Sequence, residues 1–130
     1  MAPADIDRRY AKEHLPDHAR LLANIVRWLA ADRLPLEVEG TGLVDCHLYG
    51  QQTRTILHVV NLTSEATWRA PVDELIKVGP FKVRIRTPHK VTRPSARMLV
   101  ANTSRPATVE DGSVTFQIES ILDHEVVVIE

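Results

Sequence analysis

The side chains of this sequence that are best suited to metal binding or proton transfer are those of two histidines and an aspartate. His47 and His58 lie in neighbouring predicted strands, and Asp45 is two residues from His47. If these strands pair, two imidazoles and a carboxylate converge, and such a set can bind a metal ion or move a proton. The alternative is that each histidine is bonded to the backbone or to solvent. Cys46 points away from His47 and is predicted to be a small core residue.

Aromatic side chains provide a second kind of candidate, for binding rather than for catalysis. Trp68 lies in the turn-like segment Thr67-Trp68-Arg69-Ala70-Pro71, which follows a predicted central strand. An exposed ring on a β-sandwich can stack against a sugar, whereas a ring folded over the edge of the sandwich would be structural. Trp68 and Tyr49 are therefore the candidate ligand-binding residues.

Other spacings point less specifically to chemistry. His14 and His18 have helical ligand spacing, but Pro16 between them predicts a helix that begins after His14. Glu37 and Glu39 share one face of a predicted strand, and paired carboxylates can cleave a glycosidic bond. Alternating surface glutamates are the more common explanation of such a pair. Neither a phosphate-binding loop nor a nucleophile elbow is found, so we predict no catalytic residue, no metal site and no cofactor.

The elements that would position these residues begin with one helix. Residues Pro16–Ala31 show helical periodicity, with a proline and Asp17 in the first turn and Pro35 beyond the end. A wide apolar stripe follows one face and consists mainly of Leu22, Ile25, Val26 and Leu29. This stripe is the predicted interface: it either covers the chain's own sheet or binds another chain.

After Pro35 the apolar period changes from 3.6 to 2, which is typical of strands. Runs of this kind occur at residues 36–39, 43–49, 55–62, 81–87, 97–101, 113–120 and 125–129. Glu110-Asp111-Gly112 predicts a hairpin turn before the run at 113–120. The sequence thus predicts a mainly β protein, an antiparallel sandwich of about seven strands over residues 36–130 preceded by a helical segment over 1–35. The predicted core is Val44, Cys46, Leu48, Leu57, Val59, Val83, Ile85, Leu99, Val114, Phe116, Ile118 and Val127.

Composition describes an ordinary globular chain. It has 130 residues, 44% of them hydrophobic and 25% charged, a net charge of −1 and a single cysteine. We expect a cytoplasmic protein that binds neither membrane nor nucleic acid, since the sequence shows no signal peptide, membrane span or net basic charge.

The charges are distributed unevenly along the chain. Lys77–Arg105 contains eight basic and no acidic residues, while Pro106–Glu130 contains six acidic and no basic ones. Pairing of basic and acidic strands across a sheet explains this pattern. The alternative is a basic face for an anionic partner.

Three segments of the chain resemble a known family. They are Leu15–Trp28, then Gly42–Tyr49 with Ile56–Thr63, and then Pro71–Pro80. Together they look like the C-terminal region of β-galactosidase-like glycoside hydrolases that carry a trimerisation domain. The resemblance implies that the helix corresponds to the last helix of that α/β domain and that the strands form the C-terminal β-sandwich. The catalytic barrel of the family has no counterpart in this chain, so no catalytic residue is carried over.

The resemblance implies a non-catalytic accessory or assembly module. Its expected partners are a second copy of the chain or the other domains of a hydrolase, bound through the helix. The alternative is a stand-alone carbohydrate-binding module that uses Trp68 and Tyr49. A small independent enzyme using His47, His58 and Asp45 is a third hypothesis.

Overall fold

The computed structural model describes residues 15–63, 74–87, 91 and 94–130. The chain divides into two compact units, residues 1–34 and residues 35–130. Each unit is described by itself below. The mainly β fold expected from the sequence is confirmed, because the described residues form one helix and two antiparallel sheets.

The described part of the first unit is the helix α2, Pro16–Leu29. Its proline occupies the first turn, where a missing N–H costs no hydrogen bond, and Asp17 favours the positive end of the helix dipole. Beyond the C-cap Ala30, both Ala31 and Asp32 have positive φ, and this left-handed backbone ends the helix. The predicted helix is thus confirmed to within two residues of its end.

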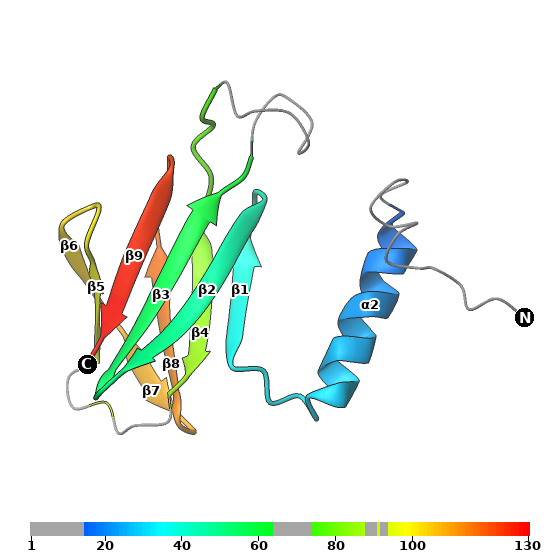
Figure 1. Cartoon of the computed structure of the whole chain (residues 1–130), viewed down its shortest axis with the longest axis horizontal. Helices are drawn as coiled ribbons and strands as arrows, with labels where there is room; N and C mark the ends of the chain where they lie inside the picture. Colours follow the sequence, from blue (N-terminus) through cyan, green and yellow to red (C-terminus); the bar gives the residue numbers. More distant parts are fainter. Residues whose placement is uncertain (1–14, 64–73, 88–90, 92–93) are drawn as a thin grey trace, which may run out of the picture. The chain divides into compact units, whose positions relative to one another are not determined.

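The second unit is a sandwich of two sheets around one core (Figure 1). The four-stranded sheet has the order β1-β4-β8-β7, and the five-stranded sheet has the order β2-β3-β9-β5-β6. All neighbouring strands are antiparallel. The strands are β1 Leu36–Gly40, β2 Val44–Gln51, β3 Arg54–Asn61, β4 Phe81–Arg86, β5 Ser95–Met98, β6 Thr103–Pro106, β7 Thr108–Glu110, β8 Ser113–Ile118 and β9 His124–Ile129.

Strict alternation explains how the sheets enclose the core. In β4, Phe81, Val83 and Ile85 are buried while the charged residues between them are exposed. β3 and β9 contribute the buried residues of the facing sheet, among them Leu57 and Val127. Edge strand β2 contributes only half-buried residues to the core, which are Val44, Cys46 and Leu48. Most of the predicted core is therefore correct.

Leu99 was wrongly predicted as a core residue. Its side chain is 45% exposed because β5 ends at Met98 and Leu99 begins the turn toward β6. The buried residues on this strand are Ala96 and Met98. Strand β6 was not predicted at all, since Thr103–Pro106 is polar and shows no alternation of apolar residues.

Turns fix the register at two points. Glu110 pairs with Ser113, so Asp111 and Gly112 form a two-residue hairpin turn with positive φ at both positions. This confirms the predicted hairpin. Gly79 also has positive φ, and a Cβ at this position would approach the carbonyl oxygen of Glu119 to 2.7 Å.

Candidate functional site

Four side chains meet on the outer face of β2 and β3, and we call them the Tyr49 cluster: Asp45, His47, Tyr49 and His58. The first three alternate along β2, so they share a face, and the half-buried Cys46 lies on the opposite face. His58 is directly opposite His47 in the register of the two strands. The sequence left open whether the two histidines and the aspartate converge. The strand register brings them together and adds Tyr49 to them.

The geometry of the Tyr49 cluster is that of a small aromatic platform. The rings of His47 and Tyr49 stack with centroids 6.5 Å apart and planes 21° apart. The ring of His58 meets Tyr49 edge-on, with centroids 5.5 Å apart and planes at 84°. Asp45 Oδ2 lies 3.1 Å from His47 Nε2 and orients that imidazole. Tyr49 nevertheless stays 54% exposed, so neighbouring rings hold the phenol in place without covering it.

Catalysis by this cluster has little structural support. Asp45 and His47 side chains are both 54% exposed, so water reaches the only ion pair of the cluster. Burial raises the pKa of the nearby Cys46 thiol and the charge of Asp45 raises it further, so this sulfur stays protonated and is a poor nucleophile. Within the described ranges, no group of three or more histidine, cysteine, aspartate or glutamate side chains could hold a metal ion.

The two strand glutamates that could have formed a carboxylate pair face cations instead. Glu37 Oε1 lies 2.9 Å from Arg84 Nη1, and Glu39 is opposite Lys82 in the register of β1 and β4. These four residues line a hollow of about 60 Å³ on the outer face of the four-stranded sheet. The arrangement places opposite charges on facing positions of two strands, as is common for alternating surface glutamates.

The acidic C-terminal segment also takes part in such pairs. Arg105 Nη2 lies 3.6 Å from Glu119 Oε1, and Arg54 Nε lies 2.8 Å from Glu130 Oε1. Of these two pairs, only Arg105–Glu119 joins the basic segment to the acidic one, and Arg105 lies on β6 of one sheet while Glu119 follows β8 of the other. Pairing of basic and acidic strands within one sheet therefore stays a prediction.

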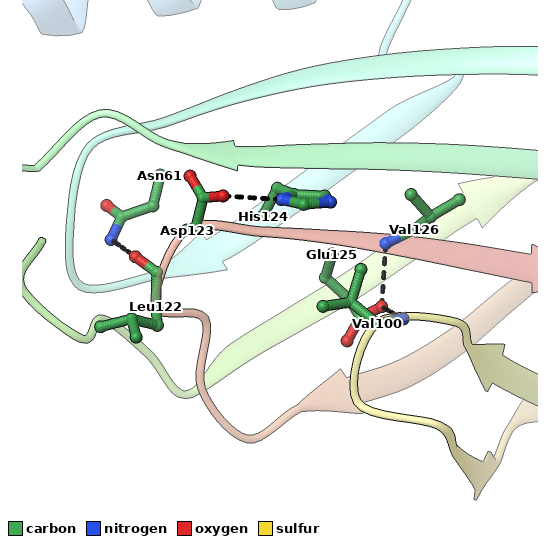
Figure 2. A network of polar contacts seen from close by, with 7 residues as sticks. All are labelled: Asn61, Val100, Leu122, Asp123, His124, Glu125 and Val126. Atoms are coloured by element: carbon green, nitrogen blue, oxygen red, sulfur yellow. Dashed lines mark hydrogen bonds and ion pairs between the residues drawn. The ribbon is translucent and has the colours of Figure 1, made fainter.

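A polar network that sequence reasoning missed lies at one end of the sandwich (Figure 2). Asn61 is 3% exposed, and its Nδ2 donates hydrogen bonds to the carbonyl oxygens of Ile76 and Leu122, each at 2.7 Å. Its Oδ1 accepts a hydrogen bond from the Thr63 N–H at 2.9 Å. All the hydrogen-bonding capacity of this amide nitrogen is thus used to join the end of β3 to two loops.

Glu125 plays a similar structural role at the start of β9. Its carboxylate accepts hydrogen bonds from the N–H groups of Val100, Ala101 and Val126, at 2.8, 3.0 and 2.9 Å. These bonds hold the turn between β5 and β6 (Figure 2). An open hollow of about 330 Å³ lies beside the network and includes Lys77 and the Asp123–His124 pair, whose atoms are 2.9 Å apart. Glu125 lines part of this hollow, but its carboxylate oxygens are already bonded to three backbone N–H groups. In the sequence, the signal for this structural role is weak: it is a glutamate that directly precedes the apolar run Val126–Ile129.

The remaining candidate residues are distributed as follows. Trp68 and His14 lie outside the described residues. On α2, Leu22 is half-buried while Ile25, Val26 and Leu29 are exposed, and no residue of the helix is buried. Neither α2 nor any other segment within the described ranges forms a helix long and apolar enough to span a membrane.

Comparison with known proteins finds similarity among solved structures. No family model matches the chain, and no curated protein matches it. Among solved structures, an α-L-fucosidase, isoenzyme 2 from Paenibacillus thiaminolyticus, superposes with a TM-score of 0.76 at 18% sequence identity. The match covers 96% of this chain and 19% of that chain. The fold is therefore similar to one part of a glycoside hydrolase, and this chain spans about a fifth of the length of that enzyme.

Proposed function

We propose that this chain is a non-catalytic accessory module of the glycoside-hydrolase type, which acts by assembly rather than by chemistry. The observation that carries the proposal is the extent of the structural similarity. A fold like this one accounts for 19% of a fucosidase chain, while the match covers 96% of this chain. The matched part of this chain is longer than the sandwich unit, residues 35–130, so the match includes part of the unit formed by residues 1–34. Helix and sandwich therefore form a combination that a hydrolase chain also contains.

The finer assignment to the C-terminal region of β-galactosidase-like enzymes is part of this proposal. It is supported by the sequence segments Leu15–Trp28, Gly42–Tyr49 with Ile56–Thr63, and Pro71–Pro80. The structural similarity to the α-L-fucosidase supports the broader class, the glycoside hydrolases. The chemistry of the described residues agrees with an accessory role, since Glu37 is paired with Arg84 and water reaches the Asp45–His47 pair of the Tyr49 cluster.

The helix α2 is the proposed assembly element. Its stripe presents Ile25, Val26 and Leu29, and the adjacent Trp28 is 78% exposed. Apolar side chains of this size, gathered on one face, are typical of contacts between folded domains. The proposed partner is a second copy of the chain or another domain of a hydrolase.

Light scattering across a dilution series tests the assembly role. We expect a solution mass above the 14.6 kDa of one chain, decreasing on dilution. Val26→Asp should abolish this excess mass because it places a charge within the stripe, whereas Asn24→Asp, outside the stripe, should leave it unchanged. A monomer at every concentration whose melting temperature falls in Val26→Asp would show that the helix covers its own sandwich. That outcome would contradict the proposal.

A further inference from the structure

We infer that the Tyr49 cluster is a binding platform for a neutral pyranose sugar. The inference rests in part on the proposed glycoside-hydrolase class, but its main support is the geometry of four side chains. Tyr49 offers a half-exposed ring whose position is fixed by His47 and His58. Asp45 lies on the far side of His47 along the same strand and bonds that imidazole. The platform therefore combines an apolar surface with hydrogen-bonding groups at its rim.

A pyranose ring matches this combination because it has two chemically different kinds of surface. Its C–H groups form an apolar face that can stack on the electron-rich face of a phenol ring. Hydroxyl groups project from its rim and can donate to a carboxylate or exchange hydrogen bonds with an imidazole. Asp45 supplies acceptor oxygens, and a neutral His58 supplies one donor and one acceptor. His47 donates its Nε2 proton to Asp45 at 3.1 Å, so when neutral it offers a ligand the acceptor Nδ1. This bond holds His47 in place beside the Tyr49 ring before a ligand arrives.

The surroundings of the cluster favour a sugar over other ligands. Asp45 would repel a phosphate, so an anionic ligand such as a nucleotide is disfavoured. Metal binding is disfavoured too, because no group of three or more ligating side chains among the described residues is placed so that it could hold a metal ion. Ile56, opposite Tyr49, and Val126, opposite His58, are half-buried and extend the outer face of the sheet with apolar area.

The two outer faces of the sandwich differ in a way that makes the platform specific. On the four-stranded sheet, Glu37, Glu39, Lys82 and Arg84 form charged cross-strand neighbours. That face offers no aromatic ring among its described outward residues. On the five-stranded sheet, β2 is an edge strand, so the platform can be approached from beyond the sheet as well as from above it. A single sugar unit or an internal unit of a longer glycan could therefore reach Tyr49.

Saturation-transfer NMR on the full chain tests the inference, with methyl β-galactoside and methyl α-L-fucoside as probes. We expect at least one probe to receive saturation at its ring C–H protons, with a dissociation constant in the millimolar range. Tyr49→Ala should weaken binding by about tenfold or more, whereas Tyr49→Phe, which keeps the ring, should stay within about threefold of the original affinity. Asp45→Asn should weaken binding to an intermediate degree.

Val109→Ala is the matched control, since Val109 is an exposed apolar residue on β7 of the other sheet. We expect this variant to bind the probes as the original chain does. The inference is overturned if neither probe receives saturation from the folded protein, or if binding survives Tyr49→Ala. It is also overturned if binding is lost in Val109→Ala instead. Oligomeric state distinguishes this failure from failure of the proposed function, because Tyr49→Ala should leave the solution mass and its dependence on dilution unchanged.

Discussion

Replacement of Asn61 tests most directly how the end of the sandwich is held together. The amide joins three segments through hydrogen bonds to the carbonyls of Ile76 and Leu122 and from the N–H of Thr63. Each bond contributes about 1 kcal/mol net, so Asn61→Ala should lower the free energy of unfolding by about 3 kcal/mol. This loss of unfolding free energy is smaller than the largest losses caused by removing a buried polar side chain. The reason is that Leu122 is exposed, so water can enter part of the space that the Asn61 amide occupied.

Asn61→Asp adds a dependence on pH whose sign is determined by the two carbonyl oxygens. An ionised carboxylate would face oxygens that now accept hydrogen bonds from Nδ2 at 2.7 Å, so the fold favours the protonated form. The pKa of the introduced carboxyl should therefore rise above the value of about 3.9 in the unfolded chain. The folded state then retains a proton that the unfolded state releases, so the loss of stability should shrink as the pH falls toward 4 and grow as it rises.

Urea unfolding followed by circular dichroism measures both effects, with Gln117→Ala as the control. Gln117 is an exposed amide on β8, so its removal should change the free energy of unfolding by less than about 0.5 kcal/mol. Our interpretation of the network would be refuted if Asn61→Ala cost no more than this control. A loss in Asn61→Asp that did not vary with pH would refute the electrostatic part.

Two further predictions concern the core and the lone thiol. Leu57→Ala should cost about 2–5 kcal/mol in urea unfolding because this side chain is fully buried, whereas Leu99→Ala in the exposed turn should cost less than about 1 kcal/mol; equal losses would contradict the assigned core. Cys46 should react slowly with iodoacetamide at neutral pH, since burial and Asp45 both raise its pKa, and Asp45→Asn should speed the reaction modestly. A rate equal to that of the unfolded chain would contradict this assignment.

Periodicity in the sequence predicted those strands whose side chains alternate between core and solvent. β4 is the clearest case, because every second residue from Phe81 is buried. β6 could not be predicted in this way, since all four of its residues are exposed and its place in the sheet comes from backbone pairing with β5. Leu99 was misplaced because a short apolar run does not reveal where its strand ends.

The register between β2 and β3 decides which side chains meet in the Tyr49 cluster, and the sequence alone did not determine that register. His47 lies opposite His58 only because β2 and β3 are joined by a two-residue turn between Gln51 and Arg54. That turn has Gln52 at positive φ and lacks the Asn-Gly or Asp-Gly pair that would have indicated it. A shift of one residue would place one histidine on the inner face. Asn61 and Glu125 were missed for a related reason, because their partners are backbone groups of loops distant in sequence.

The position of β9 has a consequence for how the chain folds during synthesis. Residues 124–129 form the last strand in chain order, yet they lie in the middle of the five-stranded sheet, between β3 and β5. Since the ribosome releases a chain from its N-terminus onward, β2 and β3 emerge long before the strand that completes their sheet. Until then β3 exposes an open edge of N–H and C=O groups, which can pair with other chains. The open edge of β3 can therefore be covered by its native neighbour only once residues 124–129 have left the ribosome.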